Sequence, residues 1–407
     1  MADGSTTQPA AFFGLPSDVQ YCKNCVISNQ RPSSAIEFKN NNKKEVIHFD
    51  DDGLCSACRY HESKWNEIDW EARQQELLKL LDRHRSKDGS YDVIVPGSGG
   101  KDSIYVSHVL KYKYGMHPLT VTWPPNMCTD IGWQNFKSWI DSGLDNISFH
   151  QNGRIHRYLT RAAFLNLGHP FQPFILGQKQ VGPKTALRYG VKLIMYGESQ
   201  AEEGNRIDEA YDPVMNPNYF SVPRAEHRHV TLGGLSYDEI IANGFSACDL
   251  QAYLPAARED IDEAGIEVHH MGYYEHWRNQ DKFYYAVENT GFNPNPERTE
   301  GTYSKYAGLD DRIDGFHYYT TFIKFGIGRA SYDAAQEIRN RHITREEGVA
   351  LVHRYDGEFP KRYFQDFLDY VDIDEDTFWK TIDSYRSPHL WRKDGNEWAL
   401  RKRVEQL

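Results

Sequence analysis

Residues 92–103 read Asp-Val-Ile-Val-Pro-Gly-Ser-Gly-Gly-Lys-Asp-Ser, and this stretch decides the fold class. A short apolar run, typical of a buried strand, passes through a glycine-rich turn into a helical sequence. Glycines let the backbone approach a ligand, and the amides and dipole of a helix N-terminus favour an anion. Lys101 is followed by Asp102, which excludes a Walker A loop, and the third glycine of G-x-G-x-x-G is missing. The stretch therefore predicts a phosphate-binding turn.

The sequence on either side of this turn alternates strand and helix. Strands are expected at 92–96, 119–123, 146–149 and 192–196, and helices at 102–114, 130–142, 154–167 and 177–189. This alternation predicts an α/β domain built on a parallel sheet with helices on both faces. A further strand is expected at 266–271, and the chain is helical again after residue 333. Glu198 follows the fourth strand, at the sheet edge where α/β proteins bind ligands.

Four of the six cysteines form two closely spaced pairs. The pairs are Cys22 with Cys25 and Cys55 with Cys58. Two such C-x2-C knuckles can close a tetrahedral four-thiolate site, and in a reducing compartment this spacing indicates a metal rather than disulfides. The set predicts a structural Zn²⁺ ion, and an iron–sulfur cluster is the alternative.

Composition limits the functional classes. The 407 residues are 39% hydrophobic, enough for a sizeable core, and the net charge is −11. An acidic chain is a poor candidate for a general nucleic-acid binder, so no nucleic-acid partner is expected. No apolar run approaches the roughly 20 residues that span a bilayer, and the N-terminus lacks the pattern of a signal peptide. We therefore expect a cytoplasmic protein without membrane insertion.

The glycine turn resembles the S-G-G-x-D-S loop of the PP-loop ATP pyrophosphatases, which have the adenine nucleotide α-hydrolase fold and cleave ATP between the α and β phosphates. The resemblance implies ATP and Mg²⁺ as ligands, with Asp102 helping to place the metal and Lys101 at the variable position. The residues implied to hold the pyrophosphate are Gly97, Ser98, Gly99, Gly100 and Ser103. The residues implied to receive the adenine through main-chain groups are Val121, Thr122 and Trp123.

A closer resemblance covers roughly residues 20–360. The order of the cysteine pairs, the glycine turn, Gly197-Glu198 and the run Ile-Lys-Phe-Gly-Ile-Gly-Arg at 323–329 is similar to that of the N-acetyl sugar amidotransferases of bacterial surface-polysaccharide synthesis, such as lipopolysaccharide O-antigen. The resemblance implies ATP-dependent conversion of an acetamido group on a nucleotide-activated sugar to an acetamidino group, through an O-adenylated imidate and ammonia. The catalytic residues that it implies are Lys101, Asp102, Glu198, Lys324 and Arg329.

The ammonia source is expected to lie elsewhere. The chain begins Met-Ala-Asp, without the N-terminal cysteine of one glutaminase type, and the Gly-x-Cys-x-Gly turn of the other type is absent. A separate glutaminase subunit, or free ammonia, is therefore expected to supply the nitrogen.

Two alternatives stay open. Cys128 follows the second strand, where tRNA-thiolating relatives carry a sulfur-transfer cysteine, so a PP-loop tRNA-modifying enzyme is the second hypothesis. The third is a non-catalytic, zinc-containing nucleotide-binding scaffold. Cys248 has no expected role, and Lys179 and Lys184 are weak candidates for phosphate contacts.

The chain is expected to divide into five segments. They are a flexible arm (1–20), a four-cysteine zinc element (21–62), a linking helix (63–90, with its helical pattern at 65–85), an ATP-binding α/β domain (91–260) and a C-terminal sugar-site and helical region (261–407).

Overall fold

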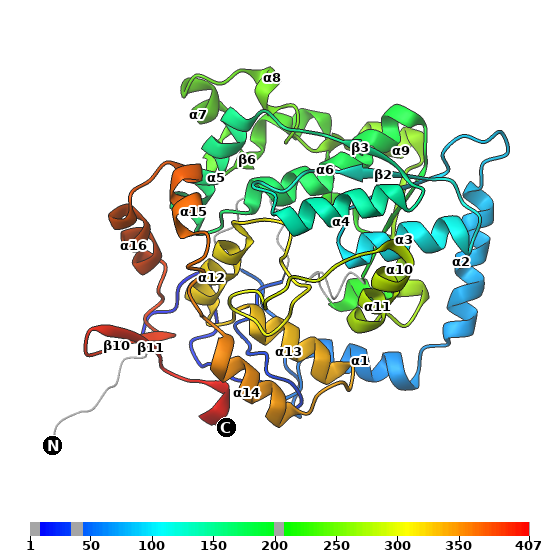
Figure 1. Cartoon of the computed structure of the whole chain (residues 1–407). Helices are drawn as coiled ribbons and strands as arrows, with labels where there is room; N and C mark the ends of the chain where they lie inside the picture. Colours follow the sequence, from blue (N-terminus) through cyan, green and yellow to red (C-terminus); the bar gives the residue numbers. More distant parts are fainter. Residues whose placement is uncertain (1–8, 34–43, 199–206, 407) are drawn as a thin grey trace.

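Five parallel strands form the central sheet of the computed structural model, which describes residues 9–33, 44–198 and 207–406 (Figure 1). The strand order is β3-β2-β1-β4-β9. The strands are β1 (Val93–Pro96), β2 (Pro118–Thr122), β3 (Asp145–Ser148), β4 (Leu193–Tyr196) and β9 (Glu267–His270). In β1, the central strand, Val93 lies opposite Pro118 of β2 and Leu193 of β4. All five strands lie within two residues of their predicted positions.

Helices cover both faces of the sheet, which confirms the predicted class. Successive side chains of β1 point to opposite faces. Val93 and Val95 pack with α2 and α3, whereas Ile94 packs with α5 and α6. The first face carries α2 (Trp70–His84), α3 (Lys101–Tyr112) and α11 (Asn279–Thr290), with α4 (Asp130–Asp141) beside them, and the second carries α5 (Gly153–Leu167), α6 (Gln172–Tyr189) and α9 (Arg258–Ala264).

Local sequence explains where two helices depart from expectation. The helix expected over 65–85 is α2, which begins only at Trp70 because Asp69 caps it by accepting a hydrogen bond from the Ala72 amide at 3.0 Å. Residues 65 and 66 instead end a separate helix, α1 (Ser56–Asn66). Helix α6 begins at Gln172, five residues earlier than predicted, because Pro173 suits a first helical turn.

The segment between β4 and α11 consists of short elements. They are η2 (Ile207–Tyr211), η3 (Pro217–Tyr219), β5 (Ser221–Val222), η4 (Arg224–His229), β6 (Thr231–Leu232), β7 (Leu235–Ser236), α7 (Tyr237–Ala242), α8 (Ala247–Leu250), β8 (Ala256–Ala257) and α10 (Met271–Tyr274). Strand β9 joins the central sheet, which therefore extends past residue 260, the expected end of the ATP-binding domain.

The C-terminal region is mainly helical, as expected. It contains α12 (Asp314–Phe325), α13 (Arg329–Arg339), α14 (Arg345–Tyr355), α15 (Phe364–Val371), α16 (Glu375–Ser384), the hairpin β10 (Trp391–Asp394)–β11 (Glu397–Leu400) and η5 (Val404–Gln406). Thr344 and Glu347 form the expected capping box at the start of α14.

The N-terminal segment packs against this C-terminal region. Residues 1–8 of the expected arm lie outside the described residues. Residues after them do not form a free arm, because the apolar side chains of Leu15 and Val19 are buried and the Phe13 ring stacks on Tyr385. The four-cysteine segment shares a hydrophobic core with α13, as its path beside α13 and α14 shows (Figure 1). Within the described ranges, no helix is both long and apolar enough to cross a membrane.

Candidate active site and metal centre

The glycine loop joins β1 to α3 in a tight path that requires glycine at two positions. A Cβ atom at Gly97 would lie 2.4 Å from the Ser103 Oγ. Gly99 has φ +87°, and a Cβ there would lie 2.7 Å from the Phe136 Cα. Gly100 forms the N-cap of α3 without a side-chain cap, and a Cβ at this position would meet nothing within 4 Å. Gly100 and the first residues of α3 line open space, and a helix N-terminus in that position suits phosphate oxygens.

Charged groups next to the loop favour a cation. The Lys101 Nζ contacts the Asp102 Oδ2 at 2.5 Å. The other oxygen, Oδ1, is buried and has no hydrogen-bond partner among the described residues. A buried carboxylate oxygen without a donor suits a hard cation such as Mg²⁺. The loop is also tied to a distant segment, because the Ser98 hydroxyl donates a hydrogen bond of 2.7 Å to Asp310.

One cavity of about 550 Å³ is lined by all five predicted catalytic residues. The predicted residues that line it are Gly100, Lys101, Asp102, Glu198, Lys324 and Arg329. The first four belong to the carboxyl edge of the sheet, and the last two belong to α12 and α13. The sequence did not indicate that Arg31 from the N-terminal segment and Asp310 also line this cavity.

Two faces of helix α13 contact different parts of the protein. Arg329, Tyr332, Asp333 and Gln336 recur at helical spacing and line the cavity. Ala334, Ala335 and Ile338 on the other face are buried against the four-cysteine segment. The helix is therefore a shared wall between the cavity and the metal element.

The two basic residues of the 323–329 run occupy different environments. The Arg329 Nε donates to the Asp333 Oδ1 at 2.9 Å, and its guanidinium lies 4.5 Å from the centre of the Tyr318 ring. Burial would lower the pKa of Arg329, but Asp333, Tyr318 and Asp314 together outweigh it and hold the pKa above its ordinary value. The Lys324 Nζ donates to the Leu167 carbonyl at 2.7 Å, at the end of α5, and lies near the Phe13 ring.

The residues expected to receive adenine are buried in the core. The side chains of Val121, Thr122 and Trp123 are at most 3% exposed. The Val121 carbonyl accepts from the Gly97 amide and the Thr122 carbonyl accepts from the Phe149 amide, both at 2.9 Å. Adenine contacts here, a role that stays a prediction, would have to use main-chain atoms.

The remaining sequence candidates lie away from the cavity lining. Lys184 donates to the Gln251 carbonyl at 2.6 Å, and the Lys179 ammonium lies 5.2 Å from the Tyr219 ring centre. Cys128 and Cys248 are exposed. Partial burial, with Asp310 nearby, raises the pKa of Cys128 to about 11, which makes its thiol a weak nucleophile at neutral pH.

The four paired cysteines converge as predicted. Their sulfur atoms all lie within 4.8 Å of one another, and all four residues are buried. The Cys22–Cys58 and Cys25–Cys55 sulfur distances are 3.7 and 3.8 Å. Tetrahedral coordination with Zn–S bonds of about 2.3 Å gives sulfur–sulfur distances of about 3.8 Å. The geometry therefore fits a single tetrahedral metal ion.

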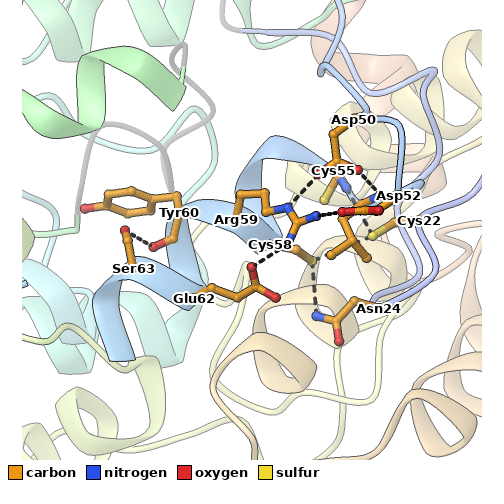
Figure 2. Close-up of polar contacts among 11 residues, drawn as sticks. Cys22, Asn24, Asp50, Asp52, Cys55, Cys58, Arg59, Tyr60, Glu62 and Ser63 are labelled. Carbon is orange, nitrogen blue, oxygen red and sulfur yellow. Dashed lines mark hydrogen bonds and ion pairs between the residues drawn. The ribbon is translucent and has the colours of Figure 1, made fainter. Parts of the chain in front are cut away.

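Surrounding donors fit negatively charged sulfur. The Asn24 side-chain amide donates to the Cys58 Sγ at 3.4 Å, and the Cys55 amide donates to the Cys22 Sγ at 3.3 Å (Figure 2). Hydrogen bonds from the other three thiols hold the pKa of Cys22 well below its usual range. Arg59 braces the adjacent loop through ion pairs with Asp50, Asp52 and Glu62, drawn in Figure 2.

Comparison with known proteins identifies the C-terminal region. Residues 300–405 match the family model described as LPS biosynthesis protein WbpG-like, C-terminal domain. The match includes the two helices, α12 and α13, that line the cavity, and it confirms the resemblance to the N-acetyl sugar amidotransferase family. No curated protein gives a significant match.

Among solved structures, the chain is similar to the U34-tRNA thiolase NcsA from Methanococcus maripaludis with its 4Fe-4S cluster. The identity is 13%, and the comparison covers 60% of this chain and 78% of that chain. The TM-score is 0.18, so this likeness supports no conclusion about the fold, the metal or the reaction.

Proposed function

We propose that this protein is an ATP-dependent amidotransferase of lipopolysaccharide biosynthesis, which converts the acetamido group of a nucleotide-activated sugar to an acetamidino group. One observation carries the proposal. The glycine loop opens into the same cavity as α12 and α13, and both helices lie in the region that matches the WbpG-like family. A phosphate-binding loop and two helices from the region that matches a lipopolysaccharide-biosynthesis family surround one cavity. This arrangement suits a reaction between ATP and a sugar.

In the proposed reaction, the amide oxygen attacks the α-phosphorus of ATP and pyrophosphate leaves, which gives an O-adenylated imidate. Ammonia then adds to the imidate carbon, AMP leaves with the electrons of the C–O bond, and the nitrogen gives up one proton to leave an amidinium group. Positioning and charge neutralisation are the main tasks of the protein. The reaction also requires that water be kept from the activated carbon, because water would return the imidate to the amide.

The loop residues have separate roles in this proposal. The amides that begin α3 bind the pyrophosphate, with Lys101 at its side. Asp102 and Glu198 hold Mg²⁺, which when bound neutralises phosphate charge. The orphaned Asp102 Oδ1 supports this role. Arg329 and Lys324 line the same cavity from α13 and α12, and in this proposal they bind the sugar substrate.

The proposed metal in the four-cysteine centre is Zn²⁺, with a structural role. An iron–sulfur cubane binds each thiolate to a different iron and spreads the sulfurs further apart than the pairs seen here. Four sulfur ligands leave no open position for a substrate, so the ion would hold the N-terminal segment against α13.

The nitrogen donor is a separate glutaminase subunit or free ammonia in this proposal. The Gly-x-Cys-x-Gly turn of one glutaminase type does not occur in the sequence, and both remaining cysteines lie outside the cavity lining. Comparing ammonium with glutamine as donors, for the purified chain alone, tests this part directly.

The decisive experiment combines Mg-ATP, an ammonium salt and a panel of nucleotide-activated acetamido sugars, with mass spectrometry of both nucleotide and sugar. We expect AMP, pyrophosphate and a sugar in which one amide oxygen has become NH. Formation of AMP without a change in any sugar would indicate that the enzyme adenylates a different acceptor, and tRNA would be tested next. Formation of ADP, or no turnover with a glutaminase present, would contradict the proposal.

A further inference from the structure

The described residues that line the cavity fall into two sets, here called the loop end and the basic end, which differ in the balance of charge. At the glycine loop, Lys101 is outnumbered by the carboxylates of Asp102, Glu198 and Asp310. At the end formed by α12, α13 and the N-terminal segment, cations outnumber carboxylates. The cations are Arg31, Lys44, Lys324 and Arg329, and the carboxylates are Asp333 and Glu337. Mg-ATP accounts for the acidic end, but it does not account for the basic end.

The two carboxylates at the basic end already have partners. Asp333 accepts from the Arg329 Nε at 2.9 Å and from the Thr302 hydroxyl at 2.5 Å. Glu337 accepts from the Gln280 side-chain amide at 2.8 Å and from the His342 ring at 2.6 Å. These bonds hold the two carboxylates in place, and the described lining residues of this end count four cations against two carboxylates.

Arg31 reaches the wall from a different part of the chain. It lies six residues after Cys25, is 7% exposed, and its guanidinium carbon lies 5.8 Å from the centre of the Tyr332 ring. Tyr332 is one helical turn after Arg329 on α13. The guanidinium groups of Arg31 and Arg329 therefore lie beside neighbouring turns of the same helix. Burial lowers the pKa of Arg31, because the surrounding protein removes water from the guanidinium group.

Arg329 is oriented by its neighbours. Its ion pair with Asp333 uses Nε, its plane lies over the Tyr318 ring, and within the described ranges it makes no other side-chain hydrogen bond. A planar guanidinium held in this way presents its terminal nitrogens as a fork, which matches phosphate oxygens.

We propose that Arg31 and Arg329 form a second phosphate subsite, distinct from the glycine loop, which binds the phosphate of the nucleotide-activated sugar. This inference rests on the proposed function for the identity of its ligand. Arg31 is then a specificity-determining residue supplied by the four-cysteine segment, and the metal element contributes directly to substrate binding. The acetamido group of the bound sugar would point toward the loop end, where ATP is activated.

The test is equilibrium binding to the full, metal-loaded chain, with UDP and CMP as probes of the subsite and a non-hydrolysable Mg-ATP analogue as the probe of the loop. We expect Arg31→Gln and Arg329→Gln each to weaken UDP or CMP binding about ten- to hundredfold, and to change binding of the ATP analogue less than about threefold. Asp102→Asn should show the reverse pattern. The matched control is Arg59→Gln, because Arg59 lies in the same segment but outside the cavity lining.

Several results would overturn the subsite. One is equal loss of ATP-analogue and UDP or CMP binding in Arg31→Gln, and another is unchanged binding of all probes in both variants. If Arg31→Gln loses its metal or unfolds, Arg329→Gln on α13 gives the deciding measurement. A wild-type chain that forms amidine but binds neither UDP nor CMP would contradict the subsite alone. Arginine-dependent binding without any amidation would contradict the proposed function and keep the subsite.

Discussion

The Ser98 hydroxyl donates a hydrogen bond of 2.7 Å to the Asp310 Oδ2, across 212 positions of the chain. The bond connects the glycine loop to the segment that leads into α12, and so joins the two halves of the cavity wall. Burial raises the pKa of Asp310, although the Ser98 hydroxyl opposes the shift. A hydroxyl that donates to Asp310 cannot donate to a phosphate at the same time. The hydrogen bond to Asp310 must therefore break before the Ser98 hydroxyl can donate to a phosphate.

Ser98→Ala should therefore affect both stability and chemistry. We expect pyrophosphate release to be abolished, because Ser98 is placed to hold the phosphates, while the chain stays folded. Urea unfolding of Ser98→Ala, Asp310→Ala and the double variant should give a coupling energy of about 1 kcal/mol, the size of a hydrogen bond to a charged group at a half-exposed site. Additive single effects would show that the bond does not join the two segments, and unchanged turnover would show that the loop role is wrong.

The sheet and the loop were predictable from sequence because their determinants are local. The strand at 92–96 is a continuous apolar run, and glycines stand where the backbone must turn into α3. Asp69 is the instructive exception. Its N-cap role starts α2 at Trp70, five residues later than the expected start at residue 65, and the apolar periodicity did not reveal this start.

The basic end of the cavity could not be predicted because its residues meet only through tertiary packing. Arg31 follows the cysteine pairs without any motif of its own, and it reaches the cavity because the N-terminal segment packs on Ala334 and Ala335. Asp310 likewise stands in an ordinary Leu-Asp-Asp-Arg sequence. The family resemblance indicated Lys324 and Arg329. It did not reveal that Lys324 binds a backbone carbonyl whereas Arg329 pairs with Asp333.

Metal removal should expose the role of the four-cysteine centre. We expect about one zinc ion per chain, bound through thiolates, and no visible absorption from an iron–sulfur cluster. Cys25→Ser should release the metal and lower the midpoint of thermal unfolding, because the N-terminal segment loses its hold on α13. Cys248→Ser is the control, since Cys248 is exposed. A stable, metal-free wild-type protein would contradict the prediction.

The pH dependence of stability should carry a contribution from Asp356. This carboxylate caps α13 by accepting from the Gly328 amide at 2.9 Å and the Ser331 hydroxyl at 2.7 Å, but burial raises its pKa to about 6. The folded chain then holds a proton that the unfolded chain releases near pH 3.8. The contribution of Asp356 to the free energy of unfolding is therefore highest below pH 3.8. It falls by at most about 3 kcal/mol as the pH rises to 6.

Asp356→Asn should remove this contribution. Between pH 4 and 6, its free energy of unfolding should rise relative to that of the wild type, and urea titrations at several pH values would measure the difference. Asp376→Asn, at an exposed position of α16, should run parallel to the wild type. A parallel curve for Asp356→Asn would show that Asp356 has an ordinary pKa.

Two lysines of the cavity should separate into a structural and a catalytic role. Lys324→Met removes a buried ammonium that donates to the Leu167 carbonyl at the end of α5, so we expect its free energy of unfolding to fall by about 1–3 kcal/mol. Lys101→Met removes a cation paired with Asp102 at the phosphate loop, so pyrophosphate release should fall sharply. Urea unfolding and pyrophosphate release, measured on both variants, test the division. A Lys324→Met variant of full stability that has lost turnover would instead assign Lys324 to the chemistry.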